Sequence, residues 1–514
     1  MEAAIHNAGL IGEPIVNRKI RTHFSHSMSA APSTTGSRRN HRLRDTLKAS
    51  QKDAACSSVM NGICDNFLSP FAVSLHATLP QIAWLTAIPQ FIGALLQLPS
   101  VLLGMHRERK QLIVTAAILQ AAAVGLLALL AWQPPFTVVS LVIASAVVYQ
   151  AAGNVVQPHW RALMGNLVPE RRRGRFFARR TRLTMMVTFS AFLAGGWILQ
   201  VSTDRGLPHS GFALVFMAAA IGRVLSARYL AMMHDPSPLP PPATERALHR
   251  TSHAVREALR NRTFRNYSLF FAAMQGAVAV GSPFFTVYLL RVLGYSYVEF
   301  TLTTASAIFA QFLMLPVWGK LGDQLGNRVV MLATGLVIPI LPALWIASDT
   351  FWPLVGAQLL SGIAWSGFSL STANYLYDLR PHQTHFAAYA AFQSGISATA
   401  VLLGALAGGY LAAALPTQIS LGGNIHAWQT PLYGVFAISM LLRLLVVCWF
   451  LPRAEEPRIR RRPQLRELIV RVARFNPISG VALDWVTVAR KPATNPVTTP
   501  EARQNDTNGA RKLD

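Results

Sequence analysis

The chain has 514 residues, of which 52% are hydrophobic and only 13% are charged. Soluble globular proteins usually carry about 25% charged residues, so this composition argues against a soluble globular enzyme. The three cysteines lie within apolar stretches, which excludes a disulfide framework and a zinc site of the CxxC type. The net charge of +25 indicates a type of partner only when the positions of the basic residues along the chain are considered.

The apolar residues are grouped into runs of about 20 residues, the length at which a helix crosses the ~30 Å hydrocarbon core of a membrane. This pattern predicts an all-α membrane protein with twelve transmembrane helices. The predicted spans, in chain order, are 54–76, 81–103, 111–132, 136–158, 182–203, 211–233, 267–291, 298–319, 329–348, 352–376, 385–414 and 429–451.

The lysines and arginines are distributed unevenly between the segments that connect these spans. With both termini on the inner side, most basic residues fall into inner segments, as the positive-inside rule describes. This bias predicts anionic inner-leaflet lipids as partners and argues against nucleic acid. Arginine far outnumbers lysine, as in GC-rich bacterial genomes, so we expect a multi-pass protein of the bacterial inner membrane with cytoplasmic termini.

One inner segment, predicted as a loop from Trp160 to Arg182, is especially rich in arginine. The guanidinium group of arginine binds lipid phosphate and carboxylates through pairs of N–H groups, so this segment is expected either to hold lipid or to lock a gate. The alternative is that its charge only sets the orientation of the protein in the membrane.

The segments outside the spans are basic and polar. Residues 1–53 lack the apolar core of a secretory signal peptide and are predicted to form a disordered cytoplasmic arm, although organellar transit peptides have a similar composition. Residues 234–266 contain several prolines, which cannot continue a helix, and are predicted to be a cytoplasmic linker between domains. Residues 452–514 are predicted to be a basic cytoplasmic tail.

Short motifs recur at a nearly constant spacing, which predicts two six-helix bundles, 54–233 and 267–451. An even number of spans in each half keeps both copies in the same orientation, so they form a parallel repeat around a central cavity. The matched motifs include Ser69-Pro70-Phe71 with Ser282-Pro283-Phe284, Leu98-Pro99 with Leu315-Pro316, Ala194-Gly195-Gly196 with Ala407-Gly408-Gly409, and Arg223 with Arg443.

The loop from Gly319 to Arg328 resembles the G-x-L-[AG]-D-x-x-G-[RN]-[RK] motif of the major facilitator superfamily. The resemblance implies a secondary carrier whose halves rock around the cavity, with this loop as a gate. Its gating residues are then Gly319, Gly322, Asp323, Gly326 and Arg328.

The corresponding loop of the first half departs from the motif. It keeps the basic residues Arg109 and Lys110 but lacks the aspartate, so the resemblance implies an asymmetric latch.

Charged residues that fall within the predicted spans require an explanation, because a charge at the centre of a membrane costs about 2.5–3.5 kcal/mol. Arg223 and Arg443 occupy equivalent places in the two halves, which favours a structural role. Asp65 lies near the middle of the first span, and the equivalent residue in the second half is Val278. We therefore predict that Asp65 binds a coupling proton or a cationic solute, the alternative being a structural carboxylate held by a neighbouring group.

Other polar or aromatic residues within the spans are candidates to line the cavity. Small-molecule sites are mostly apolar with a few placed polar groups, although polar residues also join helices to one another. The candidates are Asn66, Gln150, Asn154, Gln275, Trp365, Asn374, Tyr375 and Gln393.

The sequence contains no GxxxxGK[ST], GxSxG or HExxH motif, so we expect no enzyme activity, no cofactor and no bound metal. The predicted function is secondary active transport of a small solute by alternating access, with or without a coupled proton. The alternatives are a membrane sensor or scaffold that does not transport, and a lipid-handling protein on the same fold.

Overall fold

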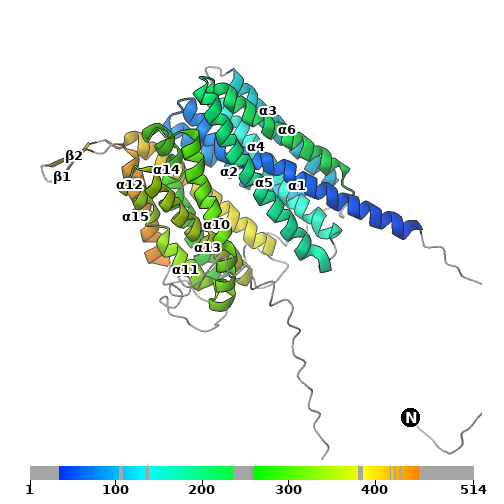
Figure 1. Ribbon diagram of the computed structural model, residues 1–514. Coiled ribbons are helices and arrows are strands. Elements are labelled where there is room, and N and C mark those ends of the chain that lie inside the picture. The colour runs from blue at the N-terminus through cyan, green and yellow to red at the C-terminus, as the bar shows by residue number, and fades with distance from the viewer. Residues whose placement is uncertain are drawn as a thin grey trace, which may run out of the picture.

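The computed structural model describes residues 34–103, 108–133, 138–168, 170–235, 256, 259–379, 386–416, 418–421, 424–427 and 430–450. Within them the chain is almost entirely helical (Figure 1). The N-terminal half comprises α1 (Thr34–Ser74), α2 (Leu79–Leu103), α3 (Arg109–Trp132), α4 (Val138–Leu167), α5 (Glu170–Asp204) and α6 (Pro208–Met232). The C-terminal half comprises α8 (Arg262–Gly281), α9 (Phe284–Val287), the π-helical turn η1 (Tyr288–Val292), α10 (Tyr297–Leu325), α11 (Asn327–Val337), α12 (Leu341–Ala347), α13 (Phe351–Asp378), α14 (Phe386–Ala414) and α15 (Leu432–Phe450).

Each predicted span coincides with a helix or with a run of consecutive helices, so the predicted all-α fold is confirmed. Ten of these helical segments are long and apolar enough to cross a membrane. The helices α1 and α13 are long enough but less apolar, and both carry polar residues that face the interior of the molecule.

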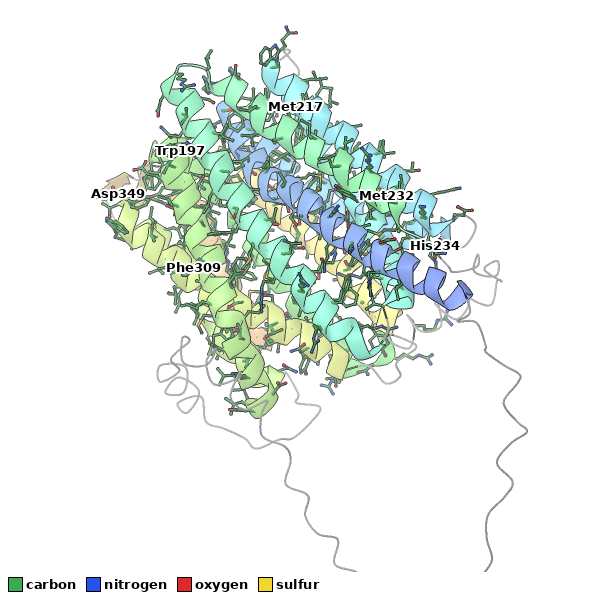
Figure 2. All side chains as sticks on the ribbon, turned by 45° about the vertical axis from the view of Figure 1, so that its right-hand side comes forward. Trp197, Met217, Met232, His234, Phe309 and Asp349 are labelled. Atoms are coloured by element: carbon green, nitrogen blue, oxygen red, sulfur yellow. The ribbon has the colours of Figure 1, made fainter. Side chains whose placement is uncertain are left out.

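The outward faces of the helices are apolar. Trp197, Met217, Met232 and Phe309 are all exposed, and they lie on the outside of the bundle in Figure 2. Large exposed apolar side chains cost free energy in water but none in lipid, so this surface is the one that contacts the membrane.

The first helix begins earlier than the sequence analysis predicted. Thr34–Asp53 belong to α1, so the predicted disorder of the arm is wrong for these residues. Thr46, Ser50 and Asp53 are buried against the rest of the N-terminal half. The apolar pattern begins only at residue 54 because this part of the helix is buried through polar contacts instead.

The arginine-rich segment predicted as a loop from Trp160 to Arg182 is also helical. The helix α4 continues to Leu167 and α5 begins at Glu170. The rings of Trp160 and Phe177 pack edge to face, 6.3 Å apart, so the arginines share these helices with an apolar face. Because so many residues of this segment are charged, the spacing of its apolar residues did not indicate a helix.

The connection between α14 and α15 contains the strands β1 (Gln418–Leu421) and β2 (Asn424–Ala427), which no predicted element covered. They pair antiparallel, with Gln418 opposite Ala427 and Leu421 opposite Asn424. The hairpin projects away from the helices (Figure 1).

The two halves share an apolar core at one end of the molecule and have separate apolar cores at the other. We call the first the contact end; it carries the connections 75–78, 205–207 and 293–296. A single apolar cluster there includes Phe71 and Phe216 from one half and Phe284 and Phe436 from the other. The opposite, basic end carries the connections α2–α3, α4–α5 and α10–α11, and each half has its own apolar clusters there.

The repeated glycine pairs lie where helices pack closely. A side chain at Gly195 would overlap Phe67 of α1, and one at Gly408 would overlap the backbone of Val280 in α8. The second glycine of each pair faces the other half instead, since Gly196 contacts Thr301 of α10 and Gly409 contacts Ala83 of α2. The predicted repeat therefore corresponds to two equivalent interfaces between the halves.

Candidate functional site

A cavity of about 210 Å³ lies where the two halves meet. The N-terminal half contributes one helix to it, α1, and the C-terminal half contributes α9, η1, α10, α12 and α13. The lining residues are Asp65, Asn66, Ser69, Phe285, Thr286, Leu289, Phe300, Thr304, Trp345 and Gln358.

Asp65 is the only charged residue among those that line this cavity. Its Oδ1 atom accepts a hydrogen bond from the Tyr149 hydroxyl in α4 at 2.8 Å. The side chain is nevertheless accessible, because it faces the cavity. The tyrosine fixes one carboxylate oxygen, and the other remains available to a bound group.

The wall formed by α1 offers a further acceptor beside this carboxylate. In a regular helix the N–H of residue 70 would bond to the carbonyl of Asn66, but Pro70 has no N–H. The Asn66 side chain is turned toward its own helix, where Nδ2 donates to the Gly62 carbonyl at 2.9 Å. Pro70 therefore leaves the Asn66 carbonyl without the backbone donor of a regular helix, one residue after Asp65.

The opposite wall of the cavity is aromatic. Phe285 and Trp345 lie with their ring centroids 4.4 Å apart, and Phe285 also stacks on Phe436 at 4.7 Å. Thr286, Thr304 and Gln358 add hydroxyl and amide groups to the same wall. A carboxylate facing rings and neutral polar groups suits a solute with a cationic or hydrogen-bond-donating part and an apolar part.

Contacts between the halves close the cavity toward the contact end. The Arg291 guanidinium donates Nη2 to the carbonyl oxygens of Ala77 at 3.0 Å and Val73 at 3.4 Å. Nearby, the backbone N–H of Tyr297 donates to Gln200 Oε1 at 2.9 Å. Arg291 lies in the C-terminal half and its acceptors in the N-terminal half, so these bonds break if the halves separate at this end.

Two residues predicted to line the cavity pack between helices of the N-terminal half instead. Gln150 and Asn154 lie on α4 against Gly93 of α2, where an added side chain would overlap the Asn154 amide. The Asn154 Nδ2 atom donates to the Gln150 carbonyl at 3.0 Å. Neither is among the residues that line the 210 Å³ cavity, and the hydrogen bond between them lies within α4.

The remaining candidates also lie outside the cavity lining. Tyr375 is buried in the core of the C-terminal half, 5.1 Å from the ring of Tyr267, and Trp365 packs edge-on against Phe368 at 5.8 Å. Gln393 is buried on α14, where Nε2 donates to Ser397 Oγ at 3.3 Å. Gln275 is half-buried on α8, and Asn374 Nδ2 donates to Asn327 Oδ1 at 3.4 Å.

The predicted gating loop is a sharp break between α10 and α11. Gly326 joins the two helices at φ +92°, a conformation that side chains with a Cβ rarely adopt. Asp323 is exposed near the end of α10, while Gly319 and Gly322 lie one turn apart on the same helix. The Arg328 Nε atom is buried at the start of α11.

In the first half, Arg109 and Lys110 are the first residues of α3, and both are half-buried. The part of the preceding loop from residue 104 to residue 107 lies outside the described residues. The proposed asymmetry of the latch therefore stays a prediction.

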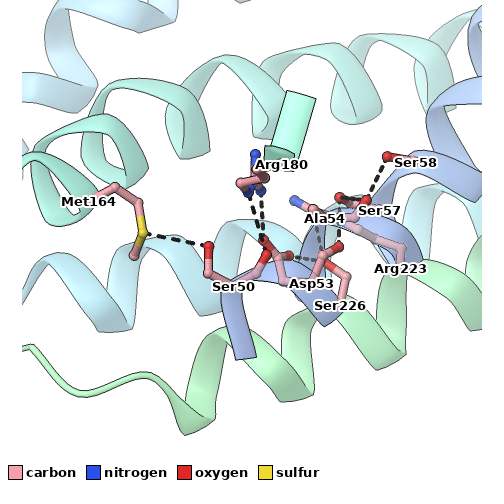
Figure 3. Close-up of polar contacts among 9 residues, drawn as sticks. All are labelled: Ser50, Asp53, Ala54, Ser57, Ser58, Met164, Arg180, Arg223 and Ser226. Carbon is pink, nitrogen blue, oxygen red and sulfur yellow. Dashed lines mark hydrogen bonds and ion pairs between the residues drawn. The ribbon is translucent and has the colours of Figure 1, made fainter. Parts of the chain in front are cut away.

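The two arginines predicted to be structural have different surroundings. Arg223 donates Nη1 to Ser226 Oγ at 2.9 Å, and Ser226 donates in turn to Asp53 Oδ1 at 2.7 Å (Figure 3). Arg443 donates to the carbonyl oxygens of Ile338 at 3.3 Å and Val278 at 3.5 Å. Arg443 therefore holds the backbone where α11 ends and where α8 ends.

Several residues near these sites were missed by sequence reasoning. Tyr149 is 84 positions from Asp65, and no local pattern pairs them. Asp53 was assigned to the arm before the first span, although the spacing of Ser50, Asp53 and Ser57 fits a helix that extends upstream. Gln358 was recognisable only as one more polar residue in an apolar span.

Comparison with known proteins gives both a family and a fold. The sequence profile of the Major Facilitator Superfamily matches residues 54–307 and 278–494, which together cover most of the chain. No curated protein sequence matches the chain.

Several solved structures have the same fold. A bacterial homologue of the iron transporter ferroportin, in an inward-facing state, is 15% identical and superposes with a TM-score of 0.62, covering 81% of this chain and 99% of the other. The nucleoside transporter NupG is 14% identical with a TM-score of 0.59, covering 79% and 98%. A bacterial homologue of the human lysosomal transporter Spinster is 17% identical with a TM-score of 0.53, covering 81% and 95%.

The profile match confirms the resemblance carried by the loop from Gly319 to Arg328. Members of this family are membrane transporters that are generally not enzymes, and they act on small-molecule substrates. The apolar helices of this chain agree with an integral membrane protein that crosses the bilayer several times. The chain therefore belongs to the Major Facilitator Superfamily.

Proposed function

We propose that the protein is a secondary active transporter that moves a small solute by alternating access through the cavity beside Asp65. The observation that carries the proposal is that both halves line this one cavity, so their relative motion changes its exposure. Parallel repeats around a shared site are the arrangement in which rocking opens the site to each side in turn. The bundles 54–233 and 267–451, joined by the linker 234–266, are the two moving parts.

The described conformation fits the state open toward the basic end. The apolar core is shared at the contact end and divided at the basic end, and Arg291 joins the halves on the contact side of the cavity. The ferroportin homologue that superposes on this chain is itself in an inward-facing state. With the basic end in the cytoplasm, where its arginines meet anionic lipid, this is the inward-facing state here also.

Asp65 is the coupling group in this mechanism. In the open state water reaches its carboxylate through the cavity, and in a closed state it is surrounded by apolar and neutral polar side chains. Isolating that charge in a membrane interior costs about 2.5–3.5 kcal/mol on insertion scales. A proton or a cationic solute removes this cost, so the halves exchange between states most readily when Asp65 is neutralised.

The experiment combines a ligand panel with a charge-removing variant. Sugars, amino acids, carboxylates, lipophilic cations and lysolipids are screened for thermal stabilisation of the purified protein at about pH 5.5 and about pH 7.5, since a ligand that binds the folded state raises Tm. A stabilising ligand whose effect depends on pH is expected to lose that dependence in Asp65→Asn. We expect its affinity to fall by about 30-fold or more if it is a cation, because losing one partner of a buried charge pair costs about 2–5 kcal/mol.

Asp349→Asn is the matched control, because Asp349 is an exposed carboxylate outside the cavity (Figure 2). It should leave ligand binding and its pH dependence unchanged. Identical pH dependence in wild type and in Asp65→Asn would refute the coupling role. Binding that is unaffected by both substitutions would place the solute elsewhere.

A further inference from the structure

A second cavity, of about 160 Å³, lies within the N-terminal half near its basic end. All of its lining residues come from α1, α3, α4, α5 and α6, and none of them lines the solute cavity. It contains Asp53, Arg180 and Arg223, together with Gln120 and Trp160. The transport mechanism proposed above does not use this cavity.

The charges around the cavity form a connected network (Figure 3). Arg180 Nη2 pairs with Asp53 Oδ2 at 3.0 Å, and Ser226 Oγ donates to the other carboxylate oxygen at 2.7 Å. Arg223 reaches Asp53 through Ser226. Both oxygens of the single carboxylate therefore have a hydrogen-bond partner, while two guanidinium groups face the same space.

Other buried polar atoms of the residues that line this cavity have no hydrogen-bond partner among the described residues. The Nε atom of Arg223 and the Nε1 atom of Trp160 are buried N–H donors without an acceptor among the described residues. Gln120 Oε1 is buried and unpaired as well, whereas its Nε2 donates to the Tyr149 carbonyl at 3.1 Å. The side chains of Arg223 and Gln120 are each only 5% exposed, and a buried N–H without an acceptor is unfavourable.

The Trp160 ring is held in place by its charged neighbour. The Arg180 guanidinium carbon lies 4.0 Å from the centroid of the ring, in a cation–π contact. Arg180 is itself fixed by Asp53. The ring that carries the free N–H is therefore positioned before any ligand arrives.

We propose that this cavity binds a small monovalent anion, a halide such as chloride or a short carboxylate such as formate. Two arginines against one carboxylate leave a single excess positive charge, which one monovalent anion neutralises. The unpaired donors are N–H groups, which bind an anion and not a cation. The bound anion joins α4 through Trp160 to α6 through Arg223.

The test uses the purified full chain in chloride-free buffer, with sodium gluconate holding the ionic strength constant. Sodium chloride, bromide, iodide, formate and sulfate are added separately, and Tm is followed with intrinsic tryptophan fluorescence. We expect a saturable rise in Tm with at least one monovalent anion and a smaller effect of sulfate. Iodide should also quench part of the fluorescence in a saturable way if it occupies the site beside Trp160.

Comparison of the halide and formate arms identifies the type of anion. Saturable stabilisation by halides only, by formate only, or by both supports the proposal. A Tm that changes only in proportion to added salt, or that responds to sulfate alone, overturns it and leaves water as the partner of these donors.

Two substitutions of tryptophan localise the effect. Trp160→Phe keeps a ring for Arg180 but removes the Nε1 donor, and we expect the Kd for the anion to rise about tenfold or more, as for the loss of a hydrogen bond to a charged group. Trp197→Phe removes a tryptophan from the lipid-facing surface and should leave the Kd unchanged. Equal Kd values in Trp160→Phe and wild type would contradict the proposed site.

A substitution in the second donor residue gives an independent check. Arg223→Lys retains the positive charge but removes the guanidinium Nε donor, so the Kd should rise in this variant also. If Arg223→Lys does not fold, Trp160→Phe alone decides the proposal.

Discussion

The two halves of the molecule share a packing framework but not their polar chemistry. Gly195 and Gly196 make the same kinds of contact as Gly408 and Gly409, one within the half and one across the interface. Pro99 lies inside α2 and Pro316 lies inside α10, the helices that form the second span of each half. The repeat therefore preserves the close contacts within each half and between the halves.

The polar groups are distributed differently. Asp65 has Val278 as its counterpart in the C-terminal half, and the aromatic wall of the cavity is provided by that half alone. The equivalent arginines differ too, since Arg223 belongs to a network with a carboxylate and Arg443 contacts backbone carbonyl groups. In the proposed mechanism, the symmetric contacts allow the motion of the halves, and the asymmetric polar groups recognise the solute.

The proline that recurs in the first span of each half, Pro70 and Pro283, has a different structural effect in the two halves. The helix α1 continues through Pro70 to Ser74, whereas α8 ends at Gly281, just before Pro283, and is followed by α9 and the π-helical turn η1. Thr286 and Leu289, which line the solute cavity, come from this irregular segment. A π-helical turn at a binding site is a recurrent feature of proteins.

The largest expected effect distinguishes the two equivalent arginines. Arg223→Met removes the cation that reaches Asp53 through Ser226, and we expect unfolding to become easier by about 1.5–3 kcal/mol, as for a lost hydrogen bond that involves a charged group. Arg443→Met removes a cation that bonds only to carbonyl oxygens among the described residues, at 3.3 and 3.5 Å, and should cost about 0.5–1.5 kcal/mol. The measurement is chemical or thermal unfolding in detergent, and equal losses would contradict the contrast.

The glycines that face the other half test the shared framework. Gly196→Ala and Gly409→Ala each force side chains or helices apart, so we expect similar losses of about 1–3 kcal/mol in the two variants. Gly356→Ala is the control, because an added Cβ meets nothing there. Thermal unfolding measures all three, and a loss confined to one of the two interfaces would show that they are not equivalent.

The smallest expected effect concerns the aromatic wall. Trp345→Leu removes a ring from the cavity, and the affinity for the transported solute should fall by about 3- to 10-fold, since an aromatic contact is worth about 0.5–1.5 kcal/mol. Trp365→Leu changes a ring in the core of the C-terminal half and should lower stability without changing affinity. Ligand-dependent thermal shifts of both variants check this, and a larger affinity loss in Trp365→Leu would favour the cavity predicted from sequence.

Sequence patterns predicted the framework well because lipid imposes long apolar helices. The spans, the repeated glycine pairs and the loop ending at Arg328 were all recognisable in this way. The helical residues 34–53 were not, since their burial depends on Asp53 and its partners on other helices. A pattern of apolar residues predicts which helices contact lipid, but it does not predict polar contacts between helices.

The candidate site was predicted only in part for the same reason. Asp65 was singled out because a carboxylate near the middle of a span is rare, and both Asp65 and Asn66 line the cavity. Gln150, Asn154 and Gln393 are equally polar, but they make contacts within or between helices. Polarity in a span indicates that a residue avoids lipid, and only the packing of the helices tells which interior surface it faces.

The central claim, that the halves rock around the cavity, is tested most directly by distances between spin labels at the two ends. In a chain without its three cysteines, one pair of labels is placed at Arg175 and Gln324 near the basic end, and another at Asp204 and Asp349 near the contact end. In lipid nanodiscs, we expect a second population with a shorter basic-end distance and a longer contact-end distance, and more of it in Asp65→Asn. A single unchanged distance for both pairs, in wild type and in Asp65→Asn, would show that the halves do not rock around the cavity.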